Sequence, residues 1–207
     1  MGCWEHTHLA AWSVALRVDA VRQVYGGCTC CAHPPLWPSE AFAVHWLSWG
    51  RKIPQVIDQR LRELGITLPA VFPPAGNYLG CVVDNGIVYA GGHGPIDGES
   101  IIRGKVGRDL SLEEGRQAAR QTALSILATL RAELGDLDRI ARIVKVFGMV
   151  NVAPGFNQTP AVIDGASDLL VDVFGDAGRH TRSAVGLAEL PFDIAVEIEL
   201  IARLRSD

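Results

Sequence analysis

Apolar and polar positions alternate with regular periods from about residue 51 onward, and these periods predict helices and strands. Apolar residues first recur at helical spacing between residues 53 and 64, which predicts a short amphipathic helix over residues 54–64. Two short apolar runs follow, residues 79–83 and 87–92, separated by Asp84-Asn85-Gly86. Asn and Gly both tolerate positive φ, so Asn-Gly between two apolar runs predicts a β-hairpin.

The second half of this region predicts two longer helices and three strands. Ser111 begins the longest helix, with Glu114 completing a capping box, and Gly135 follows its last turn. Residues 142–150 read as a strand, and a second helix begins at Thr159 and ends at Gly175. Strands are then expected over about residues 182–188 and 194–204. In the last one, large apolar residues at even positions from 194 to 200 alternate with Ala195, Glu197 and Glu199.

The predicted order after the leading helix is β-β-α-β-α-β-β. This order predicts an α+β domain with a mixed sheet and two helices on one face. No further helices are predicted to cover the other face of the sheet. Oligomer formation is therefore the simplest way to bury it.

Composition changes sharply near residue 50, which divides the chain into residues 1–50 and residues 51–207. All five tryptophans and four of the five cysteines precede this point. Cys28, Cys30, Cys31 and His33 are metal-ligand types, but they form one crowded cluster without the second dyad of a zinc module. We therefore expect no metal site, and interpret residues 1–50 as a poorly ordered extension or as sequence upstream of the true start codon.

Charge and hydropathy limit the possible partners. The chain is 48% hydrophobic and 20% charged, with a net charge of −4 and no basic run, so no nucleic-acid partner is expected. It has no apolar stretch of about 18 residues, which argues against a membrane-spanning helix. The first residues do not resemble a signal peptide, so a cytoplasmic location is expected.

Several separated motifs resemble those of the RidA/YjgF family, also called endoribonuclease L-PSP, whose fold is described as chorismate-mutase-like. The C-terminal motif is residues 180–186 (HTRSAVG), followed by Leu190-Pro191 and residues 196–199 (VEIE). Upstream, residues 76–78 (GNY) and 88–95 (VYAGGHGP) resemble the family's first loop and the end of its second strand. The resemblance covers residues from about 60 to 204, with the motifs in order and at similar spacing.

The resemblance implies a homotrimer with three clefts, one at each subunit interface. It implies hydrolysis of reactive enamines and imines that carry a carboxylate, giving a 2-keto acid and ammonia without metal or cofactor. Arg182 is expected to grip the substrate carboxylate, and Glu197 to position the attacking water. Tyr78, Gly92 and His93 are expected to line the cleft. A planar guanidinium suits a carboxylate because it donates two parallel hydrogen bonds.

The sequence departs from the family pattern at some positions. Many active members carry a cysteine where this chain has Ala184, while His93 and Gly91 replace the usual glutamine and serine. These changes leave the substrate open. They also leave open a non-catalytic trimer that binds small carboxylates or acts as a chaperone-like protein. Ribonuclease activity, suggested by the family's older name, is disfavoured because no basic, aromatic-lined groove is evident.

Overall fold

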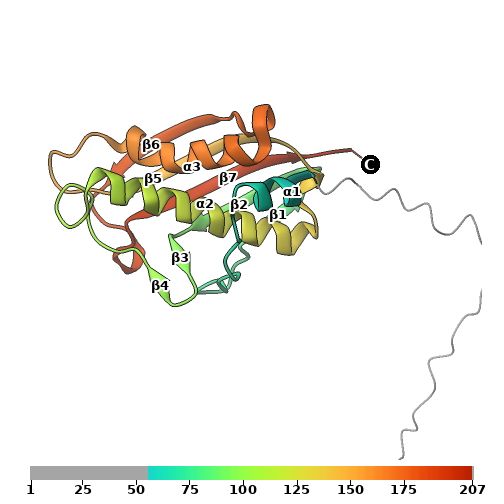
Figure 1. Cartoon of the computed structure of the whole chain (residues 1–207). Helices are drawn as coiled ribbons and strands as arrows, with labels where there is room; N and C mark the ends of the chain where they lie inside the picture. Colours follow the sequence, from blue (N-terminus) through green and yellow to red (C-terminus); the bar gives the residue numbers. More distant parts are fainter. Residues whose placement is uncertain (1–55, 207) are drawn as a thin grey trace, which may run out of the picture. The chain divides into compact units, whose positions relative to one another are not determined.

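The computed structural model describes residues 56–206, and the interpretation of residues 1–50, including the cysteine cluster, lies outside them. Helices and strands follow one another in the order shown in Figure 1. The main elements are α1 (Val56–Glu63), β1 (Cys81–Asp84), β2 (Ile87–His93), β3 (Ile96–Asp97), β4 (Ser100–Ile101), α2 (Leu112–Leu134), β5 (Ile140–Asn151), α3 (Thr159–Phe174), β6 (Thr181–Leu187) and β7 (Val196–Leu204). Short 3₁₀ turns cover Leu137–Arg139 and Gly175–Gly178, and a further turn, Pro191–Asp193, contains residues with positive φ.

The main sheet has five strands in the order β1-β2-β7-β5-β6. Only β5 and β6 in it run parallel, and α3 makes the crossover between them that parallel neighbours require. The other neighbours are antiparallel, so the sheet is mixed. The long helices α2 and α3 pack against each other on one face, as Figure 1 shows. The predicted α+β, chorismate-mutase-like fold class is confirmed.

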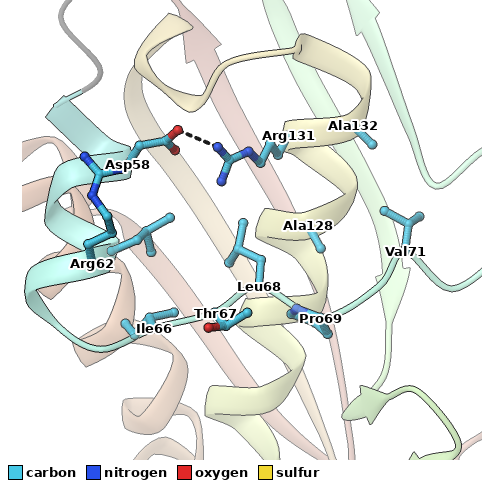
Figure 2. A pocket seen from close by; sticks show the side chains of 11 residues that line it. Asp58, Arg62, Ile66, Thr67, Leu68, Pro69, Val71, Ala128, Arg131 and Ala132 are labelled. Carbon is cyan, nitrogen blue, oxygen red and sulfur yellow. Dashed lines mark hydrogen bonds and ion pairs between the residues drawn. The ribbon is translucent and has the colours of Figure 1, made fainter.

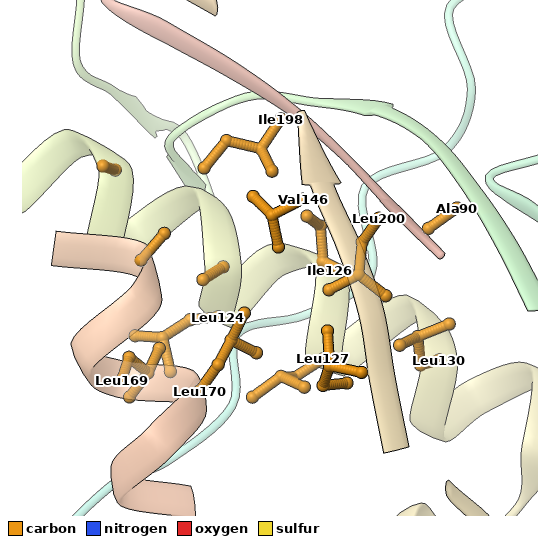
Figure 3. Packing of buried hydrophobic residues seen from close by; sticks show 14 of the residues in the cluster. Ala90, Leu124, Ile126, Leu127, Leu130, Val146, Leu169, Leu170, Ile198 and Leu200 are labelled. Atoms are coloured by element: carbon orange, nitrogen blue, oxygen red, sulfur yellow. The ribbon is translucent and has the colours of Figure 1, made fainter. Parts of the chain in front are cut away.

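The core lies between this helix pair and the sheet (Figure 3). Along β7, Ile198 and Leu200 point toward the helices and are almost fully buried, whereas Glu197 is half-buried and Glu199 exposed on the other face. This is the alternation expected of a strand with one face in the core. The helices approach closely at Gly165, where a Cβ atom would lie 2.1 Å from the backbone oxygen of Arg116.

Local signals in the sequence match their elements. The Ser111 hydroxyl accepts a bond from the Glu114 backbone N–H at 3.2 Å, and the Glu114 side chain accepts from the Ser111 N–H at 2.8 Å, as in a capping box. Asn85 and Gly86 have φ of 48° and 75°, as the hairpin requires. The small β3–β4 hairpin was not predicted, because strands of two residues are too short to show a period.

The face of the sheet opposite the helices carries exposed apolar side chains. Val82 on β1 pairs with Tyr89 on β2, which pairs with Ile201 on β7, so these three share that face. Val82 is 48% exposed and Tyr89 is 47% exposed. Covering such side chains would release water from apolar surface, which favours the expected oligomer. The homotrimer itself stays a prediction.

Within residues 56–206, no helix is both long and apolar enough to cross a membrane.

Candidate functional site

Four of the five predicted site residues line one cavity of about 310 Å³. Tyr78 comes from the loop before β1, Gly92 and His93 from the end of β2, and Glu197 from the beginning of β7. The β3–β4 hairpin, α2 and the segment before β7 complete the walls. A cavity of this size is at the small end of the range for ligand sites in proteins.

An irregularity in the sheet brings Gly92 against Glu197. The register between β2 and β7 shifts between Ala90 and His93, as in a β-bulge. A bulge turns side chains away from their regular positions and is common beside active sites. A Cβ atom on residue 92 would lie only 2.0 Å from Glu197 Oε1, so only glycine leaves room for this carboxylate.

Glu197 has the properties of a proton acceptor. Burial raises its pKa above the ordinary glutamate value, and the nearby negative charge of Glu199 adds to the rise. A carboxylate with a raised pKa holds a proton more readily near neutral pH, which improves its efficiency as a general base. Glu197 therefore brings a half-buried carboxylate with a raised pKa to the wall of the cavity.

Both ring nitrogens of His93 already have partners. Nδ1 lies 2.8 Å from the Gly91 carbonyl oxygen, which can only accept, so Nδ1 carries the proton. Nε2 lies 2.9 Å from the Thr129 hydroxyl of α2 and accepts its hydrogen. Burial lowers the pKa of His93, against the opposing effect of the bond to Gly91. His93 is thus a neutral, fixed part of the wall.

Tyr78 shapes the loop that forms one side of the cavity. Its hydroxyl accepts a hydrogen bond from the Ala75 backbone N–H at 3.1 Å. The ring is 58% exposed, so it is not a core residue. The hydroxyl hydrogen is still able to meet a ligand.

Arg182 lies apart from the other predicted site residues within one chain. It is on β6, and both β5 and β7 separate that strand from β2. Its Nη1 donates to Asp164 Oδ1 at 2.8 Å and to Ser167 Oγ at 2.9 Å, both on α3. The described chain therefore does not bring Arg182 into the cavity of Glu197. A site that contains both requires a second copy, as the expected interface cleft does.

Arg103 and Phe192 also line the cavity, although no sequence pattern pointed to either residue. Arg103 donates a hydrogen bond to the Phe192 carbonyl oxygen. Phe192 is 70% exposed and has a φ of 56°. Neither residue belongs to a periodic segment, so only the folded chain shows that they meet.

A second cavity, of about 480 Å³, lies between α1, residues 66–71 and α2 (Figure 2). Asp58 and Arg131 form an ion pair beside it, with 2.5 Å between the nearest oxygen and nitrogen. These charges neutralise each other, and none of the predicted site residues lines this cavity. It offers no group with a clear catalytic task.

Comparison with known proteins identifies the family. Residues 58–204 match the model of the family described as "YjgF/chorismate mutase-like, putative endoribonuclease". The chain belongs to this family. The match spans nearly all of the described residues and includes every predicted site residue.

Relatives agree on the family and differ in what they are called. Protein TCP17 of Trypanosoma cruzi is 43% identical over 148 residues, which cover 70% of this chain and 92% of that protein. The structure of protein Atu1372 from Agrobacterium tumefaciens, described as of unknown function, is 41% identical with a TM-score of 0.68, covering 72% of this chain and 93% of that one.

A third relative from Shewanella oneidensis is described as a "putative endoribonuclease". It is 33% identical with a TM-score of 0.69, and covers 72% of this chain and 99% of that one. Family membership thus fixes the fold, while the reaction has to be argued from the cavity.

Proposed function

We propose that this family member hydrolyses small imines that carry a carboxylate, giving a 2-keto acid and ammonia. The observation that carries the proposal is the half-buried carboxylate of Glu197, held against Gly92 in a cavity of ligand size. A general base beside the bound substrate is what addition of water to an imine needs. The family resemblance supplies the substrate class.

The reaction needs only a placed water molecule and one group that moves protons. Water adds through oxygen to the carbon of the protonated imine, while Glu197 takes one of its protons. The proton then passes from Glu197 to the nitrogen of the adduct. The carbon–nitrogen bond breaks and ammonia leaves, while the regenerated Glu197 carboxylate takes the hydroxyl proton and the keto group forms. Ammonia accepts this proton and departs as ammonium, which restores the carboxylate. Holding water and imine together makes the addition effectively unimolecular.

In this proposal Arg182 of a neighbouring copy grips the substrate carboxylate. The Arg182 side chain is 22% exposed, and Asp164 and Ser167 orient its guanidinium. A fixed guanidinium loses less freedom on binding than a mobile one. The oligomer would thus bring an oriented cation to a cavity that already contains the base.

The test generates 2-imino acids with an amino-acid oxidase and follows their disappearance with and without the protein. We expect Glu197→Gln to lower kcat about 100-fold or more, as loss of a general base does. Glu199→Gln is the matched control, because this exposed residue lies two positions along the same strand and on the same face. The kcat of Glu199→Gln should stay within about threefold of the wild-type value. Removing Glu199 changes the Glu197 pKa only by taking away a nearby negative charge.

Full activity in Arg182→Ala, or no acceleration with any imino acid, would contradict the proposal. A carboxylate-induced rise in melting temperature without turnover would instead support the non-catalytic binding protein. RNA cleavage that survives stringent purification and is lost in Arg182→Ala would favour the ribonuclease.

A further inference from the structure

Exposed aromatic side chains line the cavity that contains Glu197. Phe72 and Tyr78, from the loop before β1, are 51% and 58% exposed, and Phe192, from the segment before β7, is 70% exposed. Ile96 and Ile194 add further apolar wall. Apolar side chains that gather around a concave site and remain in contact with water indicate an apolar ligand.

Phe192 is held in an unfavourable backbone conformation. Its φ of 56° and the 57° of Asp193 are in the left-handed region, which residues with a Cβ atom rarely adopt. Hydrogen bonds from other segments hold this turn. Arg103 donates to the Phe192 carbonyl, and the Gly104 N–H donates to the Asp193 carbonyl at 2.8 Å. Asn151 Nδ2 donates to Asp193 Oδ1 at 2.9 Å. Strain that the surroundings maintain in this way is characteristic of functional segments.

The size of the cavity limits the ligand. The cavity volume of about 310 Å³ is that of the smaller ligand sites in proteins. The reacting part of an imino acid, with its carboxylate and imine, fills only part of this space. The remainder faces apolar walls, so it suits a branched or aromatic side chain and is poorly suited to a charged one.

We propose that the cavity selects imino acids with bulky apolar side chains, with Phe192 as the specificity-determining residue. Arg103 is a positioning residue, since its bond to the Phe192 carbonyl holds the turn that presents the ring. This inference rests on the proposed function and names the substrate class of that same site.

The first experiment compares kcat/KM for imino acids made from leucine, phenylalanine and alanine. We expect the two bulky substrates to be preferred over the alanine-derived one at least about tenfold, as contacts with an apolar pocket allow. Phe192→Ala should lower kcat/KM more for the bulky substrates than for the alanine-derived one, mainly by raising KM. The ratio of kcat/KM values, bulky to alanine-derived, should therefore fall about tenfold. Leu79→Ala is the matched control, since Leu79 is also 70% exposed but does not line the cavity. It should keep the ratio.

The role of Arg103 is tested by the same ratio. Arg103→Met removes the donor to Phe192 while keeping most of the aliphatic stem, and should lower the ratio as Phe192→Ala does. Arg103→Lys restores one donor and should recover part of the preference. A merely structural role would lower all rates together and leave the ratio unchanged, which would overturn the assignment.

Binding measurements separate this inference from the reaction itself. Calorimetry with pyruvate, 4-methyl-2-oxopentanoate and phenylpyruvate probes the cavity with stable keto acids, whether or not imines are turned over. Tighter binding of the two bulky acids that is lost in Phe192→Ala would support the inference even if no imine is hydrolysed. Equal binding of all three acids, unaffected by Phe192→Ala, would overturn it even if hydrolysis is observed.

Discussion

Replacing Gly92 with alanine tests directly whether Glu197 acts from its observed position. The new Cβ atom would lie 2.0 Å from Glu197 Oε1 and 3.0 Å from its Cδ. An ordinary carbon–oxygen contact is about 3.4 Å or longer, so the carboxylate oxygen must move by at least about 1.4 Å. A displacement of about 1 Å in a catalytic group can cost about 100-fold in rate. We therefore expect kcat/KM for imine hydrolysis to fall about 100-fold, which is about 2.7 kcal/mol.

Stability should change much less than activity. Glu197 is half-buried, and its side chain can rotate away from the added methyl group, so we expect the free energy of unfolding to change by less than about 1.5 kcal/mol. Gly91→Ala is the matched control: its Cβ atom would lie 3.8 Å from the nearest atom, the Gly80 oxygen. Neither glycine has a positive φ, so the pair differs mainly in the contact with Glu197.

Two measurements decide the result, the rate of ammonia release and unfolding by guanidinium chloride. Gly92→Ala with a normal rate would refute the reasoning, because the carboxylate could not have kept its position. A large loss of stability with an equal loss in Gly91→Ala would show that the bulge, and not the carboxylate, had been disturbed.

Three further predictions concern stability. Glu197→Gln should raise the melting temperature at pH 7–8, because burial raises the folded-state pKa of this carboxyl and so makes the ionised carboxylate destabilising. This gain in melting temperature should vanish as pH falls toward 4.5, where the wild-type carboxyl is also protonated. Burial lowers the pKa of His93 from 6.5, so the stability that this histidine contributes is present above that pH and is lost as pH falls below it. The difference in unfolding free energy between wild type and His93→Gln should therefore shrink from pH 7 to 5.5. Gly165→Ala places a Cβ atom 2.1 Å from the Arg116 backbone oxygen and should destabilise by about 2 kcal/mol or more in denaturant unfolding, although alanine is the better helix former.

Each of these has a clear contrary result. A Glu197→Gln protein that is less stable at pH 8 would show that the carboxylate is stabilised by its surroundings. A pH-independent difference for His93→Gln would mean that the histidine does not titrate differently on unfolding. Stabilisation by Gly165→Ala would show that α2 and α3 can separate at no cost.

Sequence periodicity was sufficient to predict the longer helices and strands, because apolar residues recur along them at regular intervals. The alternation along β7 and the capping box at Ser111 are local signals, and the elements lie within a few residues of their predicted positions. Family resemblance, rather than periodicity, distinguished Glu197 from Glu199, since both are acidic residues on the same face of one strand. The structure adds a physical difference, because only Glu197 meets Gly92 in the cavity.

The contribution of Arg103 and Phe192 could not be predicted from local pattern. They are 89 residues apart, and their contact depends on how two irregular segments meet. For Arg182 the sequence motif was recognisable, but the motif did not show where the side chain lies within one folded chain. One folded chain binds the Arg182 guanidinium to Asp164 and Ser167 and leaves it outside the cavity.

The order of strands in the sheet also has a consequence for folding. The β1–β2 hairpin and the β5–β6 pair have no hydrogen bonds to each other, and β7, the last strand along the described chain, pairs with both β2 and β5. The sheet is therefore completed by β7, which is far along the chain from its partner β2. Pairing of strands so distant in the sequence slows folding. Because Glu197 is on that closing strand, the cavity acquires this carboxylate only when the two halves of the sheet are joined. Under the proposed reaction a partly folded chain would lack its base, so recovery of imine hydrolysis during refolding would report completion of the whole sheet.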